Sequence, residues 1–260
     1  MIQTSQPVGV LLRDWRQRRR LTQLDLALEA AISPRHLSFV ETGRSQPSRE
    51  MLLHLSQELE VPLRERNALL VAGGFAPMFK ERPLNDAALA AARKAIDIVL
   101  EAQKPFPALA LDRHWNITAT NNALPELLEG VTPDLLQPPM NALRLSLHPG
   151  GVAPRIVNLA EWRSHLLHRL RRQVERTGDA TLEDLLTEVS DYPGGGDDKA
   201  IEEPSVLVPL RIRTSLGPLS FLSTTTVFGT PMDVTLSELA IEMFFPADAA
   251  TAQAVRKARQ

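Results

Sequence analysis

Residues 21–44 read LTQLDLALEAAISPRHLSFVETGR, and this stretch decides the architecture of the first part of the chain. Thr22 is a favourable N-cap for one helix, and Ser33 followed by Pro34 is a strong start signal for the next. Gly43 can end that second helix, because glycine tolerates the left-handed backbone conformation found there. The stretch therefore predicts two short helices joined by a tight turn.

Three more helices are expected around this pair. The first spans Val8 to Arg19 and carries apolar residues at helical spacing, and two others begin near Pro47 and Pro62. Helices this short are marginally stable alone, so they must pack on one another. We therefore predict an N-terminal all-α domain of five helices over residues 1–75.

The helix pair has a geometry suited to duplex DNA. A tight turn projects the second helix outward as a probe narrow enough for the major groove, and residues at its start then face base edges. Residues 1–50 hold more Lys and Arg than Asp and Glu, although the whole chain has a formal net charge of -2. A local basic surface of this kind favours phosphate binding.

The same stretch resembles the XRE family of helix-turn-helix regulators. The resemblance rests on a Thr-Gln start, a buried Leu-Ala pair, a Ser that opens the recognition helix, and a Glu-x-Gly-x close. We expect Arg35 and His36 to contact base edges, since arginine is the commonest reader of guanine. The other residues expected at double-stranded DNA, as phosphate contacts or second-rank base contacts, are Gln23, Ser33, Ser38, Phe39, Arg44, Arg16 and Arg19.

The remainder of the chain combines segments typical of strands with segments typical of helices. Residues 76–104 are expected to be a linker and connecting helix, residues 105–250 a second domain, and residues 251–260 a C-terminal tail. Alternating apolar residues predict strands, and periodic stretches predict helices between them. A mobile loop is expected at residues 192–198. The predicted segments are strands at Ala108–Asp112, Trp115–Thr120, Val206–Thr214 and Leu219–Phe228, a long helix from Leu159 to Thr177, and a strand or helix near Leu236–Phe245.

This second part resembles the ligand-binding domain of MmyB-like transcription regulators. The residues that carry the resemblance are Pro107 to Trp115, Asn121, Asn141-x-x-Arg144, Trp162, Leu170-Arg171 and Pro209-Leu210. The resemblance implies a PAS-like fold, with an antiparallel sheet, helices packed on one face, and a pocket for a small apolar ligand such as a fatty acyl chain. The chain would then be α+β.

The same resemblance suggests which residues meet the ligand. Asn121 and Arg144 would compensate a ligand carboxylate, because a buried charge needs a partner. Trp115 and Trp162 would form walls. Thr120 stands where an aromatic residue often precedes the Asn, which is a departure from the family pattern.

An enzyme is not expected, and neither is a cofactor. Glu161, His165 and His168 share one face of the long helix, a spacing compatible with one metal ion, but neighbouring arginines would repel it. We find no phosphate-binding Gly-rich loop and no nucleophile elbow. A metal-dependent hydrolase fused to a DNA anchor is therefore the remotest alternative.

The expected function is that of a ligand-responsive transcription regulator in the cytoplasm. It would act as a homodimer, because one recognition helix covers only a half-site. The chain has no cysteine, and it lacks an apolar run long enough to cross a membrane. The alternative left open is a DNA-binding protein whose second domain binds protein or dimerises and has no small-molecule ligand.

Overall fold

The computed structural model describes residues 6–194, 207–229 and 231–258. It contains two compact units, which are described here one at a time. The first unit comprises residues up to Pro83 with the short segments 175–177 and 230–237, and the second comprises the remainder. Residues 195–198 of the expected mobile loop lie outside the described residues, as does Val206 of an expected strand.

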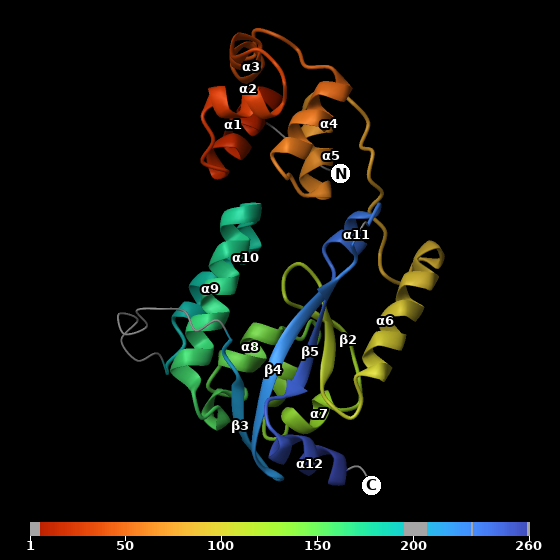
Figure 1. The fold of residues 1–260 in the computed structure, drawn as a ribbon, viewed down its shortest axis with the longest axis vertical. Helices are drawn as coiled ribbons and strands as arrows, with labels where there is room; N and C mark the ends of the chain where they lie inside the picture. The colour runs from red at the N-terminus through yellow and green to blue at the C-terminus, as the bar shows by residue number, and fades with distance from the viewer. Residues whose placement is uncertain (1–5, 195–206, 230, 259–260) are drawn as a thin grey trace. The chain divides into compact units, whose positions relative to one another are not determined.

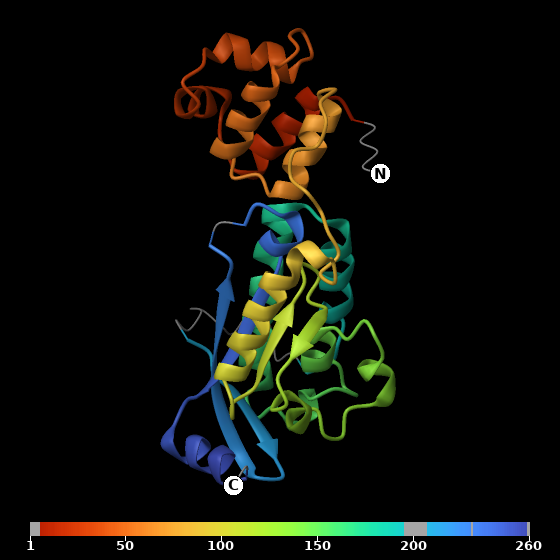
Figure 2. The same ribbon diagram turned by 90° about the vertical axis from the view of Figure 1, so that its right-hand side faces the viewer.

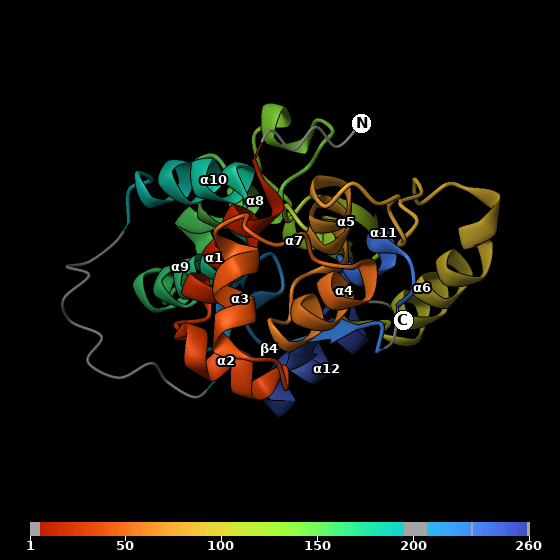
Figure 3. The same cartoon turned by 90° about the horizontal axis from the view of Figure 1, so that it is seen from above.

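The first unit begins with five helices, as the capping signals predict (Figure 3). The Thr22 hydroxyl accepts a hydrogen bond from the backbone N–H of Asp25, whose carboxylate accepts one from the backbone N–H of Thr22. The hydroxyl of Ser33 caps the next helix in the same way. The helices are α1 (Val8–Arg18), α2 (Gln23–Glu29), α3 (Pro34–Glu41), α4 (Arg49–Glu58) and α5 (Leu63–Ala72).

The core of the first unit forms where these helices cross. Leu12, Leu26 and Leu37 are fully buried, one each from α1, α2 and α3. The backbone of α1 approaches α3 so closely that a Cβ on Gly9 would lie 2.3 Å from the carbonyl oxygen of Val40. The position therefore requires glycine, and the contact fixes α1 against the end of α3.

The second unit is built on an antiparallel sheet of five strands in the described residues (Figure 1). The strand order is β2-β1-β5-β4-β3, so the last strand along the chain lies in the middle of the sheet. The strands are β1 (Ala108–Leu111), β2 (Ile117–Thr120), β3 (Leu210–Thr214), β4 (Gly217–Val227) and β5 (Ala240–Pro246).

The two faces of this sheet carry different side chains because successive residues of a strand point to opposite faces. Ala108 and Ala110 of β1 pack with Ile96 of α6 (Ala90–Ala102), and their small side chains make room for the helix. Leu109 and Leu111 point the other way, into the main core. Helices therefore lie on both faces, with α6 on one and α9 (Leu159–Thr177) on the other (Figure 2), whereas the resemblance implied one covered face.

The remaining helices complete the two units. Residues 251–257, expected to belong to a tail, form part of α12 (Ala249–Lys257), in which Thr251 and Val255 are buried. The Thr251 hydroxyl accepts a hydrogen bond from the backbone N–H of Ser220, which holds α12 to the sheet. The other helices are α6 (Ala90–Ala102), α7 (Leu124–Leu127), α8 (Ala142–Leu147), α9 (Leu159–Thr177), α10 (Ala180–Ser190), α11 (Val234–Ser237) and α12 (Ala249–Lys257), with short 3-10 turns at Ala87–Leu89, Pro133–Leu136 and Ala153–Arg155.

The prediction of an α+β chain, with a helical N-terminal part followed by an antiparallel sheet with helices, is confirmed. The strand boundaries differ in detail. Trp115, expected to start a strand, has a left-handed backbone (φ 67°) in the turn, so β2 begins only at Ile117. β3 begins at Leu210, directly after a proline that has no N–H to donate to a neighbouring strand.

Candidate functional site

The first turn of α3 lies at the surface of the first unit. Arg35 is exposed, and its guanidinium lies 5.4 Å from the ring centroid of Phe39. Arg44, in the segment after α3, lies 5.9 Å from the same ring. His36 is half-buried, and its backbone N–H donates to the Ser33 hydroxyl at 3.1 Å, which caps the helix. The arrangement presents two arginines around one aromatic ring.

Behind this surface, a buried ion pair joins α1 to α3. Arg16 Nε and Nη2 donate to the two carboxylate oxygens of Glu41 at 2.7 and 2.9 Å. Gln23 Nε2, at the start of α2, donates to the same carboxylate at 2.7 Å. The hydrogen bond to Glu41 raises the pKa of Arg16 above its ordinary value, against the opposing effect of burial. This network connects the first three helices and holds the orientation of α3.

Two of the arginines expected at phosphates have partners inside the first unit. Arg16 is buried in the pair with Glu41. Arg19 donates to the backbone carbonyls of Leu59 at 2.8 Å and Glu60 at 3.0 Å, and burial lowers its pKa. Their contact with DNA stays a prediction.

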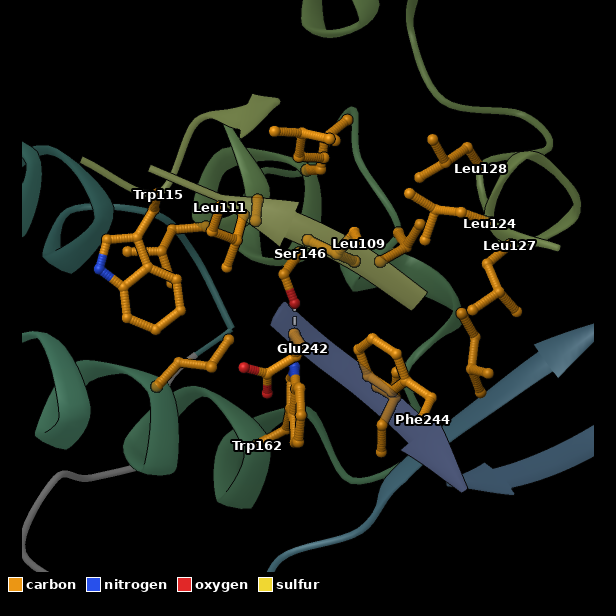
Figure 4. A pocket seen from close by; sticks show the side chains of 18 of the residues that line it. Leu109, Leu111, Trp115, Leu124, Leu127, Leu128, Ser146, Trp162, Glu242 and Phe244 are labelled. Atoms are coloured by element: carbon orange, nitrogen blue, oxygen red, sulfur yellow. Dashed lines mark hydrogen bonds between the residues drawn. The ribbon is translucent and has the colours of Figure 1, made fainter. Parts of the chain in front are cut away.

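The second unit contains a cavity of about 90 Å³ between the sheet and the helices on its inner face (Figure 4). Trp115 lies at one end, Leu127 at the other, and Glu242 between them beside Trp162. The walls are almost entirely apolar. The lining residues are Leu109, Leu111, Trp115, Ile117, Leu124, Leu127, Leu128, Ala142, Leu143, Leu145, Ser146, Val152, Trp162, Leu166, Arg169, Leu210, Ile212, Glu242 and Phe244.

Polar side chains enter this cavity at two places. The Ser146 hydroxyl accepts a hydrogen bond from Trp162 Nε1 at 2.9 Å. Arg169 Nη1 and Nη2 donate to the two carboxylate oxygens of Glu242 at 2.9 and 3.0 Å. The guanidinium of Arg169 also lies 4.9 Å from the ring centroid of Trp115, within the range of a cation–π contact. The two charged groups at the cavity wall are therefore paired with each other.

Glu242 is ionised in this setting. Burial disfavours its charged form most strongly, but hydrogen bonds and attraction from Arg169, with hydrogen bonds from Ser223 and Thr225, outweigh burial and hold the pKa of Glu242 below its ordinary value. Next to it, His165 stacks on Trp162 with ring centroids 5.7 Å apart. Burial, followed by the charge of Arg169, lowers the pKa of His165.

Comparison with protein families matches both parts of the chain. A helix-turn-helix family matches residues 12–66. The MmyB-like transcription regulator ligand binding domain matches residues 92–258, well over half of the chain. The chain belongs to the MmyB-like transcription regulators. No curated protein matches it. The resemblance to this family seen in the sequence is confirmed, and with it a DNA-binding domain joined to a ligand-binding domain.

In this MmyB-like regulator, Asn121 does not line the cavity. It is buried, and its Nδ2 donates to the carbonyls of Phe106 at 2.8 Å and Leu100 at 3.1 Å. Its Oδ1 accepts from the backbone N–H groups of Ala108 and Ala123 at 3.2 Å each. The side chain thus joins the ends of α6 and β1 to the segment after β2.

Arg144 is also engaged away from the cavity of the regulator. Its guanidinium donates to both carboxylate oxygens of Glu188 at 2.8 and 2.6 Å. The Tyr192 hydroxyl donates to the same carboxylate. Burial and this hydrogen bond raise the pKa of Tyr192 to about 12. Of the four residues proposed at the ligand, Trp115 and Trp162 line the cavity, whereas Asn121 and Arg144 do not.

The charged pair in the cavity was not identified from the sequence of the regulator. One signal for it is the run Ile241-Glu242-Met243-Phe244, in which a lone carboxylate stands within an apolar strand. Alternation along β5 puts Glu242 on the same face as Phe244, which lines the cavity. Nothing in the sequence indicated that Arg169 was its partner.

The histidines of α9 do not form a metal cluster. His165 stacks on Trp162, and Glu161 accepts a hydrogen bond from Asn158 at 2.9 Å. Within residues 6–194, 207–229 and 231–258, no group of three His, Asp or Glu side chains is arranged to hold a metal ion. Over the same residues, no helix combines the length and apolar character needed to cross a membrane.

Proposed function

We propose that this MmyB-like regulator recognises its operator through the first turn of α3 and changes its DNA affinity when a small apolar ligand occupies the second unit. The proposal includes a homodimer, a cytoplasmic location and no enzymatic activity. The observation that carries it is the exposed start of α3, where Arg35 projects from a helix whose orientation is fixed by the Arg16–Glu41 pair.

Substitution of two arginines separates base reading from phosphate binding. Arg35→Ala is expected to weaken binding to an operator, selected from random duplexes, by about 1–3 kcal/mol, with a smaller effect on random DNA. Arg44→Ala is expected to weaken both, because a phosphate contact carries no sequence information. Fluorescence anisotropy at one salt concentration measures both. Equal losses on both DNAs for Arg35→Ala would show that Arg35 does not read bases.

The cavity supports the ligand half of the proposal. Nineteen side chains converge on it, and nearly all are aliphatic or aromatic, as is usual for small-molecule sites. Solvent extraction of the purified chain followed by mass spectrometry is expected to recover a bound apolar molecule. The removed molecule, added back, is expected to raise the melting temperature and to change operator affinity. Recovery of no apolar molecule, with no thermal shift from added alkyl-chain compounds, contradicts this half.

The volume of the cavity favours a second candidate. Small-molecule pockets usually measure about 300–1,000 Å³, whereas this cavity measures about 90 Å³. A second unit that serves only to dimerise or to bind another protein needs no larger cavity. In that case the mass of the chain in solution depends on a partner or a second copy, which light scattering measures, and apolar compounds leave its melting temperature unchanged.

A further inference from the structure

The charge of the cavity is set by two side chains. Among the described residues that line it, Arg169 and Glu242 are the charged ones, and they form a bidentate pair. The pair has no net charge. Arg144, the other cation considered for a ligand carboxylate, is paired with Glu188 and does not line the cavity.

Glu242 is held in place from several sides. It lies in β5, the central strand, where its backbone is in register with Leu109 of β1 and Thr225 of β4 (Figure 1). The Thr225 hydroxyl donates to the carboxylate of Glu242 at 2.9 Å. The side chain of Glu242 is 6% exposed. The negative charge therefore stays at the cavity wall when a ligand enters.

Arg169 has two further contacts besides its pair with Glu242. Its guanidinium contacts the ring of Trp115, and Nη2 also donates to the Thr225 hydroxyl at 3.0 Å. To turn toward an incoming anion, Arg169 would have to leave Glu242 buried without a counter-charge, which is strongly unfavourable. A ligand carboxylate would lose its water, gain no unpaired cation, and meet the charge of Glu242.

A neutral polar head group loses less hydration energy than a carboxylate, needs no unpaired cation and is not repelled by Glu242. The Ser146 hydroxyl lines the cavity and accepts a hydrogen bond from Trp162. A hydroxyl that accepts one hydrogen bond can donate another, so Ser146 can serve a carbonyl or hydroxyl oxygen of a ligand. The Glu242 carboxylate, in turn, can accept from an amide or hydroxyl donor.

We propose that the cavity selects a neutral amphiphile, an alkyl or acyl chain with an uncharged amide, ester or alcohol head, and discriminates against the carboxylate of a free fatty acid. This inference rests on the proposed ligand-binding function and narrows its ligand class.

Octanamide and octanoate test the inference because they have the same chain and nearly the same head-group shape but differ in charge. Both are titrated into the delipidated full chain at neutral pH by calorimetry. Octanamide is expected to bind at least about tenfold more tightly than octanoate. Octanoate binding as tightly as octanamide, or more tightly, overturns the inference while leaving the ligand-binding function intact. If neither compound binds, the inference and the ligand-binding function both fail.

A charge-removing variant tests the cause of the preference. Glu242→Gln leaves Arg169 as an uncompensated cation, so octanoate affinity is expected to rise by about tenfold while octanamide affinity changes by less than about twofold. Glu188→Gln removes the matching carboxylate from the Arg144 pair outside the cavity, and both affinities are expected to stay at the wild-type value. An unchanged octanoate-to-octanamide ratio in Glu242→Gln overturns the inference.

The wild-type chain supplies a measurement that does not depend on a variant folding. If the protonated acid alone binds, the observed affinity for octanoate falls by about tenfold for each pH unit above the pKa of the free acid. Octanamide titrated at the same pH values corrects for protein groups near the cavity, namely Arg169, Glu242 and His165. Octanoate affinity that stays constant relative to octanamide over this pH range overturns the inference.

Discussion

The two units each contain a bidentate arginine–glutamate pair, and the two pairs have different surroundings. Arg16 and Glu41 join helices within a filled core, where their side chains are 10% and 0% exposed. Arg169 and Glu242 join a helix to a strand beside a cavity, and the side chain of Arg169 is 26% exposed. The same chemistry joins helices in the first unit and places a neutral ion pair at the wall of a cavity in the second.

The physics of buried pairs explains why one motif can serve both purposes. Desolvation of two charges largely offsets their attraction, so such a pair contributes little net stability. Loss of one partner is costly, because the other charge remains buried alone. A pair in a filled core therefore enforces one arrangement of helices. A pair at a cavity wall instead leaves the cavity with no net charge.

The largest effect is expected for Glu41→Ala. Arg16 would be left buried without its carboxylate and Gln23 without its acceptor, at a cost of about 3–5 kcal/mol to the first unit. Hydrogen exchange of the α1–α3 amides, followed by mass spectrometry, measures this unit separately from the second. Glu58→Ala is the control, because Glu58 lies at the surface 3.9 Å from His54, and its loss is expected to change stability by less than about 0.5 kcal/mol. Similar exchange in the two variants would mean that the Arg16–Glu41 pair does not hold the helices together.

A smaller loss is expected for Glu242→Gln, because Gln can still accept a hydrogen bond and Arg169 is partly hydrated. At neutral pH we expect the second unit to lose about 1–3 kcal/mol. The pKa of Glu242 is lowered in the folded chain, so its contribution is present above the ordinary Glu pKa of about 4.3 and is lost as pH falls through the folded value. The melting temperatures of wild type and variant should therefore converge on acidification. A constant difference down to the acid limit would show that the carboxylate of Glu242 gains no stability from ionisation.

The smallest effect is expected for Arg144→Ala. Arg144 and Glu188 are 40% and 38% exposed, and an exposed pair contributes about 0.2–1 kcal/mol. Denaturant unfolding is expected to show a loss within that range, and calorimetry with octanamide an unchanged affinity. A clear drop in octanamide affinity would place Arg144 at the ligand after all and would weaken the contrast between the cavity pair and the surface pair.

Local signals made much of the first unit predictable. Thr22 and Ser33 cap the helices that they were expected to cap, because an N-cap depends on residues two or three positions away. The Arg169–Glu242 pair could not be predicted from the sequence, because it joins side chains 73 positions apart and depends on how β5 aligns with its neighbours. Residue type alone does not tell which groups a polar side chain contacts. From the sequence, Asn121 fits a contact with a ligand as well as it fits the hydrogen bonds to backbone groups that it makes in the structure.

The central place of β5 has a consequence for how such a regulator can acquire a new inducer. Both edges of the strand are hydrogen-bonded, to β1 and to β4, so its backbone is among the best supported in the second unit. A substitution at position 242 changes the charge presented to the cavity without removing any of those backbone bonds. If the cavity binds the inducer as proposed, the residue that selects its charge is separate from the hydrogen bonds that hold the sheet, and a change at this one side chain is expected to exchange neutral for anionic inducers.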